Sequence, residues 1–242
     1  MTKLSVNINK IATIRNARGG NTPNLVEAAI KIQEFGGQGI TIHPRPDERH
    51  VRYQDVYDLK PVVKTEFNIE GKPIDSFMDL VLANKPEQVT LVPDADDAIT
   101  SNSGWDTIKH FDYLTDVIKT FKDAGIRTSI FLDPNKELVE AAAKTGADRI
   151  ELYTEEFATQ YSIGNLDAII PYKETALLAI EHGLAVNAGH DLSLDNIQYF
   201  IEQIPEIAEV SIGHALISEA LYMGLENTIQ SYLRKIEVAN LK

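Results

Sequence analysis

The sequence predicts an α/β fold, a closed (β/α)₈ (TIM) barrel. Its 242 residues are an ordinary length for one such barrel. Eight short apolar runs alternate along the chain with longer segments of helical periodicity. The runs are rich in Val, Ile, Leu and Phe and alternate little with polar residues, as parallel strands buried on both faces do. A doubly wound open sheet is the structural alternative, but eight regular units favour closure.

The predicted strands follow one another at regular intervals, each bounded by helix or turn signals. They cover residues 4–9, 39–43, 65–70, 88–93, 128–133, 149–154, 185–190 and 209–214.

Helical patterns fill the intervals. Thr22 is a candidate N-cap with Pro23 at the first helical position, so we expect the first helix to begin there. Later helices are predicted from apolar residues that recur at helical spacing. Their apolar positions are Ile74, Phe77, Met78 and Val81; Ile108, Phe111, Leu114, Ile118 and Phe121; Leu138, Ala141 and Ala142; Leu177 and Ile180; Ile197, Phe200, Ile201 and Ile204; and Leu221, Leu225, Ile229 and Leu233.

Composition narrows the function classes. Lys and Arg total 23 against 36 Asp and Glu, a net charge of −13, which disfavours a nucleic-acid or anionic-membrane binder. No apolar run approaches the roughly 18 residues that span a bilayer. The chain has no cysteine, which excludes thiol chemistry and fits a reducing compartment. We therefore expect a cytoplasmic protein with a single domain over residues 1–242, no membrane partner and small-molecule ligands.

Active sites of these barrels lie at the carboxyl ends of the strands. His43, His190 and His214 each end a predicted strand, and His50 follows one. A single histidine there could be a cap or a core residue, but three at one rim indicate acid–base chemistry. Glu70 would be costly to bury without a partner, which indicates a ligand-facing group. The alternative for Glu70 is a structural ion pair with an arginine.

Metal and nucleotide chemistry have weaker support. His43, Glu70, His190 and His214 could in principle bind zinc or iron, but no HxH or HxxxH pair anchors such a site. Neither a GxxxxGK loop nor a GxGxxG turn is present. We expect no metal and no organic cofactor.

Two kinds of loop suggest phosphate binding. Barrels often hold phosphate after strands seven and eight, where this chain has the sequences AGH (residues 188–190) and GHA (213–215). Residues 15–20 form a basic stretch, RNARGG, which could build a second anion site with Arg45 and His50. A solvated basic loop is the alternative for that stretch.

Five motifs, in order and spacing, resemble the pyridoxine 5′-phosphate synthase family. They are VNINKIATIRNARG (6–19), GITIHPRPDERH (39–50), FNIE (67–70), VNAGH (186–190) and IGHA (212–215). The resemblance implies a (β/α)₈ barrel with extra helices, assembled as a homo-octamer. It implies cofactor-free ring closure of 1-deoxy-D-xylulose 5-phosphate with 3-amino-2-oxopropyl phosphate, giving pyridoxine 5′-phosphate, phosphate and water in vitamin B6 biosynthesis.

The resemblance also assigns roles to residues. His43 corresponds to the proton acceptor, Glu70 to a catalytic glutamate and His190 to the proton donor. Positions matching Asn7, Arg18, Gly213 and His214 hold the amino-ketone phosphate, and positions matching Arg45, His50 and Thr100 hold the deoxyxylulose phosphate.

Five residues depart from the usual family pattern: Asn9, Lys10, Tyr153, Asp191 and Ser211. Asn9 and Lys10 stand where Asp-His is common, so this edge of the site gains positive charge. We expect Lys10 to contact the sugar phosphate, with a solvent-facing lysine as the alternative. Asn9 and Asp191 are also candidate substrate-binding residues.

Two other functions remain open at this stage. A barrel isomerase or lyase acting on another sugar phosphate would share the phosphate loops. A barrel that only binds a phosphorylated metabolite would need no acid–base residues.

Overall fold

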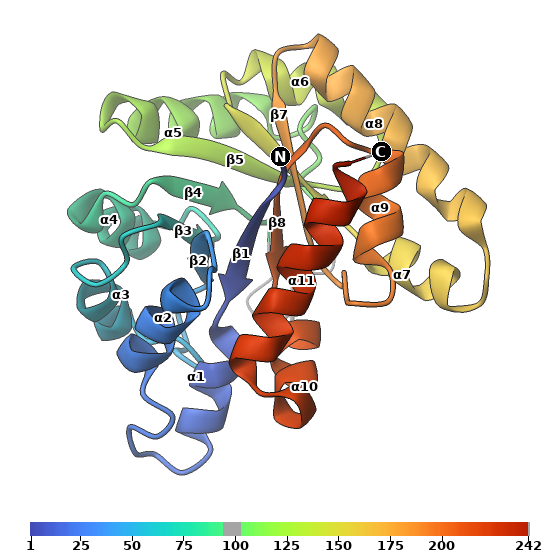
Figure 1. Cartoon of the computed structure of the whole chain (residues 1–242). Helices are drawn as coiled ribbons and strands as arrows, with labels where there is room; N and C mark the ends of the chain where they lie inside the picture. The colour runs from blue at the N-terminus through green and yellow to red at the C-terminus, as the bar shows by residue number, and fades with distance from the viewer. Residues whose placement is uncertain (94–102, 242) are drawn as a thin grey trace.

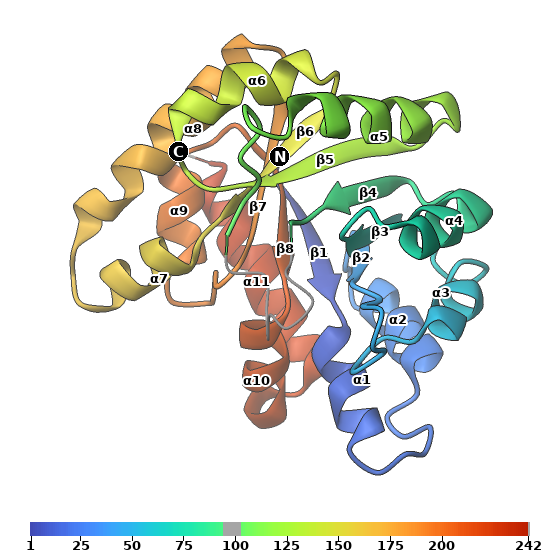
Figure 2. The same cartoon turned by 180° about the vertical axis from the view of Figure 1, so that it is seen from behind.

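Eight parallel strands close into a barrel in the computed structural model, which describes residues 1–93 and 103–241. Each strand pairs with the next one along the chain, and β1 pairs with β8 to close the ring (Figures 1 and 2). The strands are β1 (Lys3–Asn7), β2 (Gly39–Ile42), β3 (Glu66–Gly71), β4 (Gln88–Leu91), β5 (Arg127–Leu132), β6 (Arg149–Tyr153), β7 (Ala185–His190) and β8 (Ile207–Ile212). The predicted fold class is confirmed.

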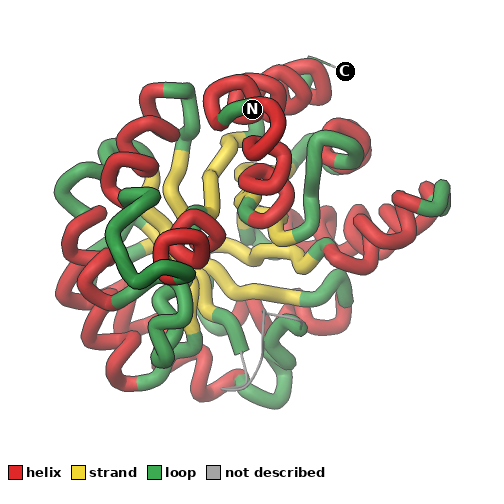
Figure 3. Tube along the Cα trace, turned by 90° about the horizontal axis from the view of Figure 1, so that it is seen from below, coloured by secondary structure: helices red, strands yellow, loops and turns green. Residues whose placement is uncertain are grey.

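Helices enclose the strands on the outside (Figure 3). Helices lie in the intervals between the strands, as expected, and several extra helices are present. The α-helices are α1 (Asn9–Asn16), α2 (Leu25–Glu34), α3 (Tyr53–Leu59), α4 (Asp75–Asn84), α5 (Phe111–Asp123), α6 (Val139–Lys144), α7 (Glu155–Ser162), α8 (Ile170–Glu181), α9 (Ile197–Gln203), α10 (His214–Met223) and α11 (Leu225–Ala239). Two 3₁₀ turns, η1 (Lys136–Leu138) and η2 (Leu166–Ile169), precede α6 and α8.

Two predicted helix boundaries are wrong. The first large helix begins at Leu25 rather than at Pro23, because the side chain of Asn24 accepts the Glu27 N–H at 2.9 Å and caps it. The last predicted helix is two helices, α10 and α11, separated by Gly224 at φ 79°. A left-handed residue ends a helix, and glycine adopts that conformation without steric cost.

Other helix predictions fail at single positions. Ile108 lies outside α5 and is exposed. Leu177 and Ile180 do lie in a helix, α8, as predicted, but they are exposed, and α8 turns Tyr172, Ala176 and Ala179 to the core. Because α8 is apolar on several sides, its sequence periodicity does not identify the buried face.

The hydrophobic core runs through the whole described chain, from Leu4 to Ala239. It fills the layer between the strands and the surrounding helices. The single-domain interpretation stays a prediction, which this shared core supports. No helix in the described ranges is long and apolar enough to cross a membrane.

The inside of the barrel is polar toward the amino ends of the strands. Arg149 donates to Asn187 at 3.0 Å and lies 4.0 Å from Glu66 and 3.7 Å from Glu209. Arg127 pairs with Glu66 and bonds Gln88 at 2.9 Å. Buried charges require such partners, so these side chains form one connected network.

Glu209 takes up a proton more readily in this network than it does in the unfolded chain. Burial and the neighbouring carboxyl of Glu66 raise the pKa of Glu209 well above its ordinary value of 4.5. The unfolded chain ionises this carboxyl near pH 4.5, whereas the folded protein keeps it protonated to higher pH. The free energy of unfolding therefore falls as pH rises from 4.5 towards the higher pKa of the folded state.

Glu209→Gln should remove this pH-dependent loss of stability, because glutamine imitates the protonated acid. The Tm of the variant should exceed that of the unmodified protein by an amount that grows as pH rises above 4.5. Thermal unfolding followed by circular dichroism measures it, with exposed Glu237→Gln as the control. Melting curves that shift in parallel at all pH values would contradict the protonated state.

Candidate active site

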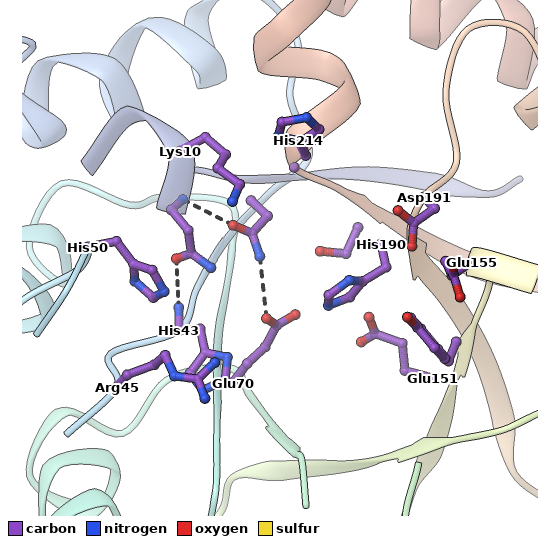
Figure 4. A pocket seen from close by; sticks show the side chains of 15 residues that line it. Lys10, His43, Arg45, His50, Glu70, Glu151, Glu155, His190, Asp191 and His214 are labelled. Atoms are coloured by element: carbon purple, nitrogen blue, oxygen red, sulfur yellow. Dashed lines mark hydrogen bonds between the residues drawn. The ribbon is translucent and has the colours of Figure 1, made fainter. Parts of the chain in front are cut away.

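A cavity of about 530 Å³ opens at the carboxyl ends of the strands (Figure 4). It gathers residues from six strand ends that are far apart in the sequence. They are Asn7, Asn9, Lys10, His43, Arg45, His50, Glu70, Glu151, Tyr153, Glu155, His190, Asp191, Ser211, Gly213 and His214. The three residues predicted to be catalytic, His43, Glu70 and His190, therefore share one cavity.

Asparagine side chains join the first three strands at this rim. Asn7 donates through Nδ2 to Glu70 Oε2 at 3.3 Å and accepts the Asn9 N–H at 3.0 Å. Asn9 Oδ1 in turn accepts the His43 N–H at 2.9 Å. This chain of bonds, drawn in Figure 4, fixes Glu70 and His43 relative to β1. Asn9 has a positioning role here that the sequence did not indicate.

One side of the cavity is electropositive. Burial, together with the charges of Arg45 and Lys10, lowers the pKa of His50 to about 4. Burial also lowers the pKa of His43 well below its ordinary value, with His50 and Arg45 adding to the effect. The rings of His43 and His50 lie 6.2 Å apart. Both imidazoles are therefore neutral at neutral pH, and Lys10 and Arg45 carry the positive charge.

The opposite side is acidic. Figure 4 shows Glu151, Glu155 and Asp191 across the cavity from His43, Arg45 and His50. Burial raises the pKa of Asp191, an effect that the neighbouring His214 opposes. It also raises the pKa of Tyr153 to about 12, with the charges of Glu155 and Asp191 contributing, so this phenol stays neutral.

Glu151 was missed by the sequence analysis. It is almost fully buried, and burial raises its pKa to about 7 against a hydrogen bond with Thr90 and the charge of Arg149. A carboxyl with this pKa can give or take a proton at neutral pH. Its place near the end of the predicted strand 149–154 was the available signal, but no motif gave it a role.

His190 packs against two aromatic rings. Its imidazole lies 5.5 Å from the ring of Phe131 and 5.6 Å from that of Tyr153, which meets it edge to face. Tyr153 and Phe131 contact each other at 5.4 Å. The three rings hold this wall of the cavity together.

All five departures from the family pattern line the cavity: Asn9, Lys10, Tyr153, Asp191 and Ser211. Among the described residues, one substrate-binding candidate does not line the cavity. Arg18 is exposed beyond the end of α1. Thr100 lies outside the described residues.

The glycine predicted for phosphate access after strand seven has another role. A Cβ on Gly189 would lie 2.6 Å from the Ser211 carbonyl oxygen and 3.0 Å from Glu151 Oε1. Close approach of β7 to its neighbours requires glycine here. A Cβ on Gly213 would lie 3.2 Å from Asn7 Cβ, so that glycine lets β8 approach β1.

The predicted basic loop at residues 15–20 is wrong for its first two residues, which belong to α1. Arg15 is buried and forms a two-pronged ion pair with Asp55, at 2.6 and 2.8 Å. Its guanidinium also donates to the His50 carbonyl at 3.1 Å. Asn16 donates to the same carbonyl at 2.8 Å. These residues bind the protein's own chain rather than an anion.

The Arg15–Asp55 ion pair and the bonds from Arg15 and Asn16 to the His50 carbonyl hold the segment that carries His50. The ring Nδ1 of His50 accepts the Val51 N–H at 2.9 Å. The proton of the neutral ring is therefore assigned to Nε2, which makes Nε2 the donor. Arg15 and Asn16 thus connect α1, which carries Asn9 and Lys10, to the segment that carries His50.

The four residues considered as metal ligands, His43, Glu70, His190 and His214, all line the cavity. Within residues 1–93 and 103–241, however, no group of three or more His, Asp or Glu side chains is arranged to hold a metal ion.

Comparisons of the sequence with a family model and with individual known proteins agree with each other. The family model described as "Pyridoxal phosphate biosynthesis protein PdxJ" matches residues 4–238. Pyridoxine 5′-phosphate synthase of Christiangramia forsetii is 68% identical over 98% of this chain and 100% of its own length. That of Flavobacterium johnsoniae is 67% identical with the same coverage.

Solved structures with similar folds have very different sequences. A 3-keto-L-gulonate-6-phosphate decarboxylase from Vibrio cholerae aligns with a TM-score of 0.67 at 11% identity, covering 98% of both chains. A phosphoribosylanthranilate isomerase from Thermotoga maritima aligns with a TM-score of 0.63 at 12% identity, covering 98% of this chain and 100% of that one. These similarities concern the barrel fold alone.

Arg15→Met should destabilise the protein by about 3–5 kcal/mol, because it leaves the buried Asp55 carboxylate without its partner. Urea unfolding measures the loss. Arg15→Met combined with Asp55→Asn should recover part of it, since no unpaired buried charge remains. Lys31→Met, which breaks the exposed Lys31–Glu34 pair, is the control and should cost less than about 1 kcal/mol. Equal losses in Arg15→Met and Lys31→Met would mean that the buried Arg15–Asp55 pair contributes no more stability than an exposed pair.

Proposed function

The chain belongs to the family of pyridoxal phosphate biosynthesis protein PdxJ, and from that premise we propose how its cavity makes pyridoxine 5′-phosphate. It is an enzyme of vitamin B6 biosynthesis with the activity of its relatives, pyridoxine 5′-phosphate synthesis. We assign 1-deoxy-D-xylulose 5-phosphate and 3-amino-2-oxopropyl phosphate as its two substrates, and phosphate and water as the other products.

One observation carries this assignment: His43, Glu70 and His190 reach a single cavity whose two sides carry opposite charge. Ring closure requires an amine to attack a ketone, followed by dehydration, loss of phosphate and an aldol-type closure. Each of these steps moves protons, and imidazole and carboxyl groups can move them near neutral pH.

Proton acceptors and donors are available at suitable places. His43 is the proton acceptor in this proposal, because its lowered pKa keeps the ring neutral and able to take a proton. His190 is the donor, and Glu70 assists, bonded to Asn7. Glu151, with a pKa of about 7, exchanges a proton with the reacting molecules across the cavity.

The charge distribution suggests how the substrates lie. The deoxyxylulose phosphate binds the electropositive side at Lys10, Arg45 and His50, with Thr100 as a further contact from outside the described residues. The phosphate of the amino ketone binds near Asn7, Gly213 and His214, where α10 begins, with Arg18 as a further contact. Its amino group faces the carboxyl groups of Asp191, Glu151 and Glu155.

We also propose that the enzyme works in the cytoplasm as a homo-oligomer, an octamer by family resemblance. Exposed apolar side chains support association. Leu221 and Tyr222 at the end of α10 are 72% and 91% exposed, and Ile163 after α7 is 75% exposed. Light scattering on the purified protein measures the assembly.

The decisive experiment mixes the purified protein with both substrates together and with each alone. Pyridoxine 5′-phosphate, detected by mass, should form only when both are present. Conversion of a single sugar phosphate would favour an isomerase or lyase. Binding without any turnover would favour a barrel that only senses a metabolite.

His43→Ala, Glu70→Gln and His190→Ala should each lower turnover by about 10²- to 10⁴-fold, as expected for acid–base groups. Circular dichroism should show an intact fold. Exposed His182→Ala, outside the cavity, is the control and should keep full turnover. Near-normal turnover in any of the three would remove that residue from the proposed mechanism.

Lys10→Ala should raise KM for the deoxyxylulose phosphate about tenfold to a hundredfold, the effect of losing a charge-assisted hydrogen bond. KM for the amino ketone should change little. Steady-state kinetics measures both, with Lys3→Ala at the opposite end of β1 as the control. A loss in kcat with both KM values unchanged would place Lys10 in the chemistry instead.

A further inference from the structure

The backbone at His190 is strained. Its φ is +78°, a conformation that residues other than glycine rarely adopt. The Asp191 N–H donates to the Gly189 carbonyl at 3.2 Å, so residues 189–191 form a three-residue γ-turn. With positive φ at its centre this turn is the rare and strained form. Such strain persists only where surrounding contacts hold it.

The hydroxyl of Thr154 contacts both ends of this turn. Thr154 follows β6 directly and is fully buried. Its Oγ1 donates to the Gly189 carbonyl oxygen and accepts from the Asp191 N–H at 3.4 Å. One side chain from the neighbouring strand end therefore spans the turn whose central residue is His190.

Neighbouring groups leave the turn little room. Residue 189 cannot carry a Cβ, because Ser211 and Glu151 lie too close. The imidazole of His190 is packed against Phe131 and Tyr153. If the turn relaxed to an ordinary negative φ, the ring would leave this aromatic contact and change its direction in the cavity.

We propose that Thr154 is a positioning residue for His190. Its hydroxyl fastens the strained γ-turn and so aims the imidazole into the cavity, a role that rests on the proposed function of His190 as proton donor. Substrate binding depends on groups elsewhere in the cavity, so loss of the hydroxyl should impair the chemical step more than binding.

Thr154→Ala and Thr154→Ser test the proposal, because the two variants differ only in the hydroxyl. The alanine variant should lose about 10- to 100-fold in kcat, the scale of a small misplacement of a catalytic group. Both KM values should stay within about threefold. The serine variant should keep kcat within about threefold, because it retains the hydroxyl.

A matched pair at Thr107 controls for the loss of a buried hydroxyl. Thr107 is also fully buried, and its Oγ1 donates to the Leu138 carbonyl at 2.6 Å, away from the residues that line the cavity. Thr107→Ala and Thr107→Ser should have equal kcat. Equal kcat in Thr154→Ala and Thr154→Ser, or equal losses at the two sites, would overturn the proposal.

Crystal structures of the two Thr154 variants separate this proposal from the proposed function. His190 should keep positive φ in the serine variant and lose it, with the Tyr153 contact, in the alanine variant. The φ of His190 can be compared even if the protein makes no pyridoxine 5′-phosphate. Absence of that product would refute the proposed function but not the positioning role of Thr154. If alanine prevents folding, Thr154→Val takes its place. An unchanged His190 without the hydroxyl would overturn the positioning role.

Discussion

The pairing of β1 with β8 closes the barrel, and the candidate site depends on that closure. Val6 pairs with Ile40 of β2 on one side and with Ile212 of β8 on the other. Closure makes the first and last strands neighbours, so Asn7 meets Gly213 although about two hundred residues separate them. In an open sheet these two edges would lie apart, and the cavity would lack a wall.

The closed ring also separates charge across the cavity. The segments after β1 and β2 supply Lys10, Arg45 and His50, whereas β6, β7 and the residues after them supply Glu151, Glu155 and Asp191. Low pKa values for the buried imidazoles and raised pKa values for the buried carboxyls follow from the same burial. His43 and His50 therefore stay neutral at neutral pH, and Glu151 has a pKa of about 7, which suits a reaction made of proton transfers.

Side chains outside the cavity keep these groups in place. Arg15 and Asp55 tie α1 to the segment after β2, and Asn9 ties α1 to His43. On the other side, Thr154 and the aromatic rings surround His190. Both supports connect residues far apart in sequence, so the precision of the site comes from contacts between neighbouring strand ends.

The sequence alone determined the barrel, the rim on which the site lies and the residues that resemble a family, because strand periodicity and short motifs are local properties. It could not give the roles of Arg15, Gly189 and Glu151. Arg15 looked like part of a solvated or anion-binding loop, and only the fold brings Asp55 against it. Likewise Gly189 needs to be glycine because β8 lies within 2.6 Å of where its Cβ would be. Burial, ion pairing and pKa depend on which strands become neighbours, and only the tertiary structure decides that.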